Sequence, residues 1–193
     1  VDRFNDILVT QTLSLGIEQR KGMLFDMLLE LLRSQSENIR GIYERNDVKI
    51  RELEGMAENK GWFMPETVED KNTVTEIVEN GIRYSVDVEN GQKTGFFLDQ
   101  KYNRQAVARI AKGKHVLDCF THTGAFALNA AAGGAASVTA VDVSAEAVRM
   151  TGINAEKNGF KDVVKPLEAN VFDLLTKLAE EKSHAYDFII LVP

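Results

Sequence analysis

Hydrophobic and polar positions follow different periods in the two halves of the chain. In the first half, apolar residues recur at three- and four-residue spacing over residues 17–34, which predicts an amphipathic helix. Short apolar runs predict strands at 7–11 and 39–44, and residues 1–4 lead directly into the first of them, as in a strand pair. The apolar stripe of the helix, which we expect to lie in a core, is formed by Leu24, Met27, Leu28, Leu31 and Leu32.

The remainder of the first half contains a strong turn signal. Residues 47–56 predict a short helix or an irregular connection, and residues 57–72, rich in acids with a glycine and a proline, predict a loop. Asn80-Gly81 then separates two runs of alternating polarity, at 74–79 and 82–88. This pattern predicts a β-hairpin, because both turn positions require a positive φ. We therefore expect residues 1–88 to form a small α+β domain.

From about residue 95, strand and helix patterns alternate, which is typical of an α/β domain with a parallel sheet. We assign this second domain to residues 89–193. Ser144 is the expected N-cap of one of its helices, and Asn158-Gly159 is the expected stop signal of the same helix. The predicted strands and helices, in chain order, are 115–119, 125–132, 138–143, 145–158, 163–167, 171–181 and 186–191.

The first predicted strand of this domain ends in a candidate ligand-binding turn, Asp118–Gly124, which leads into a helix. Backbone N–H groups at such a helix start can meet a polar ligand, and Gly124 allows a close approach to the main chain. A dinucleotide site requires three glycines in the pattern G-x-G-x-x-G, but Gly124 is the only glycine in this turn. The turn therefore favours a smaller zwitterionic ligand, and disfavours a nicotinamide-dependent oxidoreductase.

Two further strand ends carry polar residues that suit a nucleoside. Asp142, which ends the second strand, can accept hydrogen bonds from both ribose hydroxyls. After the third strand, the Asn170 side chain could accept from an adenine amino group, and the Val171 N–H could reach a ring nitrogen. All three turns are expected at the carboxyl edge of the sheet, where α/β proteins bind ligands.

These turns resemble the first three cofactor motifs of class I methyltransferases. Two further segments resemble the bacterial 23S rRNA 5-methylcytosine methyltransferases of the large subunit methyltransferase I type. They are the segment from Gly91 to Arg104 (GQKTGFFLDQKYNR) and the segment from Gly41 to Val48 (GIYERNDV), which is followed by Leu53-Glu54-Gly55. The resemblance covers nearly the whole chain. It implies a Rossmann-like methyltransferase core that holds the first half of the sheet, preceded by the α+β domain.

The resemblance implies S-adenosyl-L-methionine as cofactor and 23S rRNA as partner in the intact protein. It implies neither a metal site nor a catalytic residue within this chain, although Asp99 and Arg104 could also contact cofactor or substrate. The cofactor-binding candidates, from the turns and the resemblance together, are Phe97, Gln100, Asp118, Phe120, Thr121, Thr123, Gly124, Asp142, Val143, Asn170 and Val171.

The resemblance also implies parts that this sequence does not contain. The family has an N-terminal PUA domain, an Asp-Pro-Pro motif after the fourth strand, and a later cysteine that adds to cytosine C6 and so activates C5. Here Val192 stands where the aspartate is expected, and the chain ends at Pro193. We therefore expect a fragment that binds the cofactor without methyl transfer. A guanine-N2 methyltransferase and a non-catalytic cofactor-binding module remain alternatives.

Composition narrows the remaining choices. The one cysteine, Cys119, excludes an internal disulfide framework, and the scattered histidines give no metal-ligand spacing. The net charge of −6 arises entirely from residues 1–94, because residues 95–193 contain equal numbers of acidic and basic residues. The sequence therefore lacks the basic surface that is usual for a nucleic-acid-binding protein. The resemblance attributes this to the absent PUA domain. With no leader and no membrane-length apolar run, we expect a cytoplasmic protein. Exposed edges of a half-sheet predict a homodimer.

Overall fold

The computed structural model describes residues 1–192 and forms two compact units. Unit 1 comprises Val1–Ile77 and Ser85–Phe97, and unit 2 comprises Val78–Tyr84 and the chain from Leu98 onward. The chain therefore passes from unit 1 to unit 2, back again, and once more into unit 2. Pro193, the last residue of the chain and part of the segment where the fourth motif is expected, lies outside the described residues.

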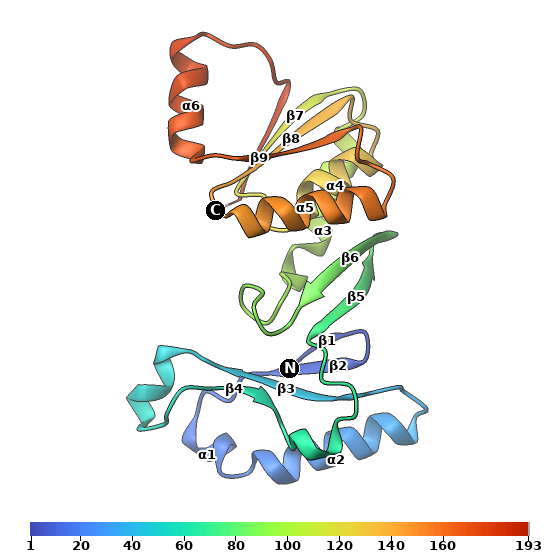
Figure 1. Cartoon of the computed structure of the whole chain (residues 1–193), viewed down its shortest axis with the longest axis vertical. Helices are drawn as coiled ribbons and strands as arrows, with labels where there is room; N and C mark the ends of the chain where they lie inside the picture. The colour runs from blue at the N-terminus through green and yellow to red at the C-terminus, as the bar shows by residue number, and fades with distance from the viewer. Residues whose placement is uncertain (193) are drawn as a thin grey trace. The chain divides into compact units, whose positions relative to one another are not determined.

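A four-stranded sheet forms the centre of unit 1, in the order β1-β2-β3-β4 (Figure 1). β2 and β3 are parallel, whereas the outer pairs β1–β2 and β3–β4 are antiparallel, which confirms the predicted strand pair at the N-terminus. The strands are Asp2–Phe4, Ile7–Thr10, Gly41–Asn46 and Asn59–Trp62. The loop prediction at 57–72 is wrong for β4, because Asn-Lys-Gly-Trp pairs through its backbone and has no alternating polarity.

The helix predicted over 17–34 is two helices, α1 (Leu15–Glu18) and α2 (Lys21–Ser34). The prediction of its core face is also wrong in part. Members of the expected stripe that are exposed are Leu24, Met27 and Leu31. The residues that pack against Leu8 and Ile42 of the sheet are Phe25, Leu28, Leu29 and Leu32. Both sets obey helical spacing, because the segment from Met23 to Leu32 is apolar at eight of its ten positions. Periodicity therefore could not select the face.

A hairpin of β5 (Val74–Glu79) and β6 (Ile82–Asp87) follows two 3₁₀ helices, Lys49–Glu54 and Pro65–Thr67. Its turn residues have positive φ, 55° at Asn80 and 79° at Gly81, which confirms the predicted turn. The base of the hairpin belongs to unit 1 and its tip, residues 78–84, to unit 2.

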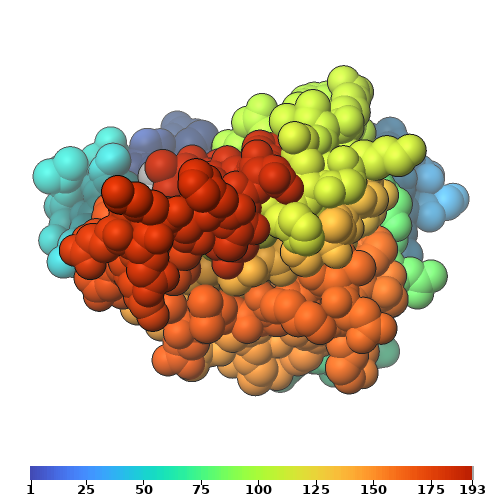
Figure 2. Space-filling model, turned by 90° about the horizontal axis from the view of Figure 1, so that it is seen from above, coloured from blue at the N-terminus to red at the C-terminus, as the bar shows by residue number. Residues whose placement is uncertain are grey.

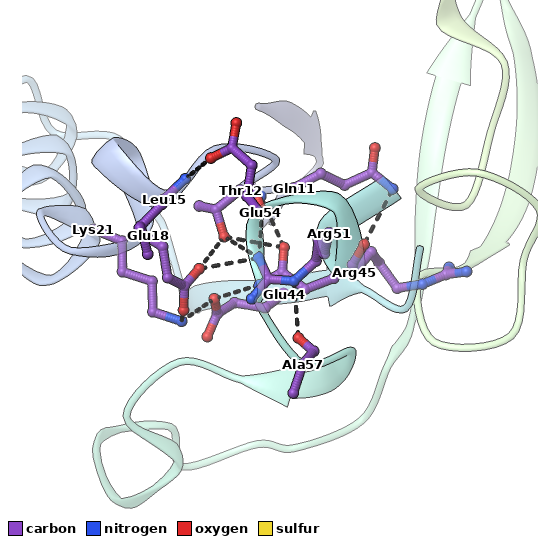
Figure 3. A network of polar contacts seen from close by, with 11 residues as sticks. Gln11, Thr12, Leu15, Glu18, Lys21, Glu44, Arg45, Arg51, Glu54 and Ala57 are labelled. Atoms are coloured by element: carbon purple, nitrogen blue, oxygen red, sulfur yellow. Dashed lines mark hydrogen bonds and ion pairs between the residues drawn. The ribbon is translucent and has the colours of Figure 1, made fainter. Parts of the chain in front are cut away.

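A polar network lies at the end of the unit 1 sheet beside α1 and α2 (Figure 3). Lys21 pairs with Glu18 at 2.8 Å and with Glu44 at 2.7 Å. Arg51, which is only 2% exposed, pairs with Glu18 at 3.0 Å and also donates to Thr12. The network joins β3, the segment after β2, two helices and a 3₁₀ helix through two acidic and two basic side chains, whose charges cancel.

Unit 2 has the α/β architecture that the sequence predicts for the second domain. Its parallel sheet has the order β10-β7-β8-β9, and helices cover both of its faces (Figure 1). The strands are β7 (His115–Cys119), β8 (Ser137–Asp142), β9 (Val164–Glu168) and β10 (Phe188–Leu191). The helices are α3 (Lys101–Ile110), α4 (Ala125–Ala132), α5 (Ala145–Lys157) and α6 (Val171–Glu180), preceded by a 3₁₀ turn at Leu98–Gln100.

Successive residues of β7 point to opposite faces of this sheet. Val116 packs in the core beneath α3, α4 and α5, whereas Leu117 and Cys119 pack in the core beneath α6. Ser144 accepts from the Ala147 N–H at 3.3 Å, which confirms it as the N-cap of α5. In the space-filling view of Figure 2 the red C-terminal residues lie beside yellow-green ones. Within residues 1–192, no helix is long and apolar enough to cross a membrane.

Candidate functional site

Three loops of unit 2 meet at the carboxyl edge of its sheet, after β7, β8 and β9. The parallel register sets Cys119 beside Val141 and Asp142 beside Glu168, so the loops start at neighbouring positions. Backbone bonds then join them: the Thr121 N–H donates to the Val141 carbonyl at 2.9 Å, and the Ala169 N–H to the Asp142 carbonyl at 3.0 Å. The turns singled out in the sequence thus form one continuous edge.

The loop after β7 has an unusual backbone. Phe120, His122 and Gly124 have positive φ values of 59°, 53° and 83°, whereas the intervening threonines do not. In this turn the Gly124 N–H donates to the Thr121 carbonyl at 2.9 Å, which closes the loop tightly. At Gly124 a Cβ would lie 2.7 Å from Leu128 and 2.8 Å from Thr151, so the turn requires glycine for space as well as for φ.

Asp118 lies beneath this turn, with 1% of its surface exposed. Its Oδ2 accepts from the Thr121 hydroxyl at 2.6 Å and from the Ala127 N–H at 3.0 Å, so the carboxylate joins both ends of the turn. Burial raises the pKa of Asp118 to about 7, because these two hydrogen bonds only partly offset the loss of solvation and the charge of Asp142 adds to it. The side chain thus organises the turn from below.

Asp142 is half-buried and joins the first two loops. Its Oδ2 accepts from the His122 N–H at 2.9 Å, and its Oδ1 from the Ser144 N–H at 3.0 Å. Each oxygen retains a second lone pair for a ligand. Burial lowers the pKa of the His122 side chain, although the Asp142 charge opposes this, so the imidazole is neutral at pH 7.

The sequence did not reveal how α5 supports the turn. The Thr151 hydroxyl donates to the His122 carbonyl at 3.1 Å, and the Asn154 amide donates to the Thr123 carbonyl at 3.0 Å. Both side chains are fully buried. The two residues are three positions apart, about one turn of α5, and this spacing gives no local signal because their partners lie about thirty residues earlier.

The third loop contributes a cap and an aromatic pair. Asn170 is the N-cap of α6, and its Oδ1 accepts from the Phe172 N–H at 2.9 Å. Val171 is buried under the sheet, and Val143 is exposed. Phe172, which the sequence analysis missed, is 70% exposed and meets the Phe120 ring edge-on at 5.8 Å. An exposed aromatic ring beside Asn170 is suited to stacking on a planar ligand.

Phe97 and Gln100 fall in different units. In unit 1 the Lys93 ammonium lies over the Phe97 ring, 4.5 Å from its centre. Gln100 in unit 2 donates to Asp99 at 3.0 Å and accepts from Asn103 at 2.8 Å. Their roles in ligand binding remain predictions. Arg104, which the resemblance offers as a possible contact, is buried in an ion pair with Glu79.

Comparison with known proteins identifies the family. The family of S-adenosylmethionine-dependent methyltransferases matches residues 57–193. The chain belongs to this family. It is 43% identical over its full length to ribosomal RNA large subunit methyltransferase I of Shewanella denitrificans and 41% identical to the same enzyme of Tolumonas auensis. The chain spans about half of these relatives, 47% of each.

A solved structure with a bound ligand has a fold similar to that of this chain. A methyltransferase complexed with SAH matches 97% of this chain and 46% of its own, with a TM-score of 0.76 and 28% identity. These findings confirm the predicted class I methyltransferase fold and the resemblance to the large subunit methyltransferase I type.

The edge of unit 2 fits the family's cofactor. Its turn has no room for a Cβ at Gly124, so the main chain is open to close approach there. Within residues 1–192, the Thr123 hydroxyl is one of few buried side-chain atoms without a hydrogen-bond partner. A buried hydroxyl left without a partner costs free energy unless a ligand or water completes it.

Cys119 does not fit the role of a nucleophile. It is fully buried in the core beneath α6, and burial together with the Asp118 charge raises the pKa of its thiol to about 11. Nucleophilic addition requires the thiolate and access to the substrate. Cys119 provides neither.

Proposed function

We propose that unit 2 binds S-adenosyl-L-methionine at the carboxyl edge of its sheet. The continuous arrangement of the turn around Gly124, the Asp142 carboxylate and the Asn170 loop supports this assignment. The methionine carboxylate would lie against the backbone of residues 121–124, next to the Thr123 hydroxyl. Asp142 would accept from the ribose hydroxyls, and Asn170 with Val171 would bind the adenine beside Val143 and Phe172. The cofactor supplies a methyl group on a positively charged sulfur.

Isothermal titration of the chain with S-adenosylhomocysteine tests the site. We expect Asp142→Ala to weaken binding by about ten- to a hundredfold, as for the loss of hydrogen bonds to a charged group. Asp142→Asn, which keeps an acceptor, should lie between this variant and the wild type. Asp162→Ala removes an exposed aspartate elsewhere in unit 2 and should bind as the wild type does. Unchanged affinity in Asp142→Ala would refute the site, and no binding by the wild type would refute the function.

We further propose that the longer protein methylates ribosomal RNA, at cytosine C5 of 23S rRNA. The name of the relatives and the segments at 41–48 and 91–104 support this substrate. Nucleoside analysis of RNA treated with the longer protein should yield 5-methylcytidine. N2-methylguanosine would instead favour an amino-group methyltransferase, and cofactor binding without any product would favour a non-catalytic module.

We propose that this chain alone transfers no methyl group to RNA. A cytosine C5 reaction of the covalent type requires a thiolate, and the one cysteine of the chain is buried and protonated at neutral pH. Radiolabelled methyl incorporation into 23S rRNA by residues 1–193 would contradict this. Addition of the longer protein to the same RNA is the positive control.

Two predictions concern organisation. The division into domains at 1–88 and 89–193 predicts that limited proteolysis cuts first between them. The predicted homodimer would pair strand edges such as β10, whose Ile189 and Leu191 are about half exposed. A monomer mass by light scattering would contradict the homodimer.

A further inference from the structure

The tip of the β5–β6 hairpin forms part of the same compact unit as the cofactor turn. The tip consists of residues 78–84, and its polar side chains are directed at the starts of α3 and α4. Glu79 and Tyr84 are 7% and 0% exposed, so these contacts are made without competition from water.

One contact is a buried ion pair. Arg104 of α3 donates to Glu79 at 2.6 Å, and both side chains are almost completely buried. The same guanidinium lies over the ring of Phe126, 5.7 Å from its centre. Since Phe126 is the second residue of α4, the pair reaches the first turn of the helix that follows Gly124.

A second contact reaches the residue directly after Gly124. The Asn129 side-chain amide donates to the Tyr84 hydroxyl at 2.9 Å and to the Ala125 carbonyl at 2.8 Å. The Tyr84 hydroxyl lies 3.5 Å from the same carbonyl. The Ala125 carbonyl is thus held from two sides, by its own helix and by the hairpin.

The turn residue of the hairpin completes the arrangement. Asn80 donates to the Lys101 carbonyl at 3.2 Å and to the Asn129 side-chain oxygen at 3.3 Å, and it accepts from Gln105 at 2.8 Å. Asn80 therefore joins the first turn of α3 to the Asn129 side chain that holds the start of α4.

We infer that the hairpin tip is a brace that holds the cofactor turn in its binding geometry, with Tyr84 and Asn129 as positioning residues. The inference rests on the proposed function. The positive φ of Gly124 directs the chain into α4, so a shift of Ala125 changes the direction of the N–H groups in the turn before it. The brace acts on cofactor affinity through the backbone and touches no ligand.

A matched contact on the same hairpin supplies the control. Asn158, at the end of α5, accepts from the Arg83 N–H at 2.9 Å and donates to the Arg83 carbonyl at 2.7 Å. Like Asn129 it makes a side-chain bond to the tip, and its other side-chain bond is to the Asn154 carbonyl within α5, at 2.8 Å. Loss of Asn158 should loosen the hairpin without moving Ala125.

Titration calorimetry with S-adenosylhomocysteine, on the whole chain, tests the brace in Tyr84→Phe, Asn129→Ala, the double variant and Asn158→Ala. We expect Tyr84→Phe and Asn129→Ala each to weaken binding about fivefold, the value of one buried hydrogen bond. The double variant should lose less than the product of the two, because both act on one carbonyl. Asn158→Ala should lower the unfolding midpoint but keep wild-type affinity.

The outcomes separate the brace from the proposed function. Absence of binding by the wild type would overturn both. Wild-type affinity in both Tyr84→Phe and Asn129→Ala would overturn the brace and leave the cofactor site in place. Equal weakening in all three single variants would also overturn it, since that result indicates general loosening of the fold.

Discussion

A cluster of polar side chains is buried in unit 1 and another at the candidate site of unit 2, and the two differ in charge balance. In unit 1, Glu18 and Glu44 meet Lys21 and Arg51 at 3.0 Å or less. In unit 2, Asp118 is 1% exposed and accepts only from a hydroxyl and a backbone N–H among the described residues. In the unit 1 cluster each acid pairs with a base, whereas Asp118 in unit 2 has no cationic partner among the described residues.

The pKa values follow this difference. Burial raises the pKa of Glu18, but hydrogen bonds from Lys21, Thr12 and Arg51 outweigh it and bring the pKa to about 2. Burial raises the pKa of Asp118 to about 7, and its hydrogen bonds do not compensate. The balanced cluster therefore stabilises the fold over the whole neutral range. The unbalanced one lies beneath the turn where we propose that the cofactor binds.

Removal of Arg51 breaks the balance in unit 1 and should have the largest effect. Arg51→Ala leaves Glu18 without one of its cations and Thr12 without a donor, at a site that is 2% exposed. Breaking a buried pair from one side costs about 3–5 kcal/mol. Urea unfolding of the chain should show this loss as a lower midpoint at unchanged slope.

The control is an exposed pair of similar geometry. Arg149 donates to Glu146 at 2.6 Å within α5, but both side chains are more than half exposed. Arg149→Ala should leave the unfolding midpoint unchanged, because water and salt screen such a pair. A similar loss in the two variants would show that burial does not distinguish the unit 1 cluster.

Asp118 predicts a pH dependence of opposite sign to that of Glu18. The folded pKa of about 7 exceeds the unfolded value, so the contribution to stability is complete below about pH 4 and is lost as the pH rises through 7. Between these limits one proton changes the free energy of unfolding by at most about 1.4 kcal/mol per pH unit. Urea unfolding from pH 5 to 8 should show stability falling in the wild type relative to Asp118→Asn.

The difference between the two proteins isolates this group. His122, whose pKa burial lowers, acts in the opposite direction but is present in both. Glu18 titrates near pH 2, outside the range. If the stability of the wild type and of Asp118→Asn changed in parallel with pH, the cost of burying the Asp118 charge would be offset by its surroundings. The two clusters would then not differ in their effect on stability.

The sequence predicted unit 2 better than unit 1, for a physical reason. Alternating strand and helix patterns set the parallel sheet, and a single glycine after β7 indicated the turn, since both depend on local spacing. The supports of the turn come from elsewhere in the chain: Thr151 and Asn154 from α5, and Tyr84 from the hairpin. Such partners are set by packing, and no local pattern encodes them. β4 was missed because its polar residues pair only through the backbone.

A substitution at Met27 of α2 has the smallest predicted effect, and its comparison with Phe25 tests which face of the helix lies in the core. Met27 is 60% exposed, whereas Phe25 is 5% exposed and meets the Phe63 ring at 5.0 Å. Met27→Lys should therefore change the free energy of unfolding by no more than about 0.5 kcal/mol. Phe25→Lys should cost about 3 kcal/mol or more, since it removes a core ring and buries a charge. Urea unfolding of the two variants measures both values. A large loss in Met27→Lys would instead show that the face of Leu24, Met27 and Leu31 is buried in solution, through self-association of the chain.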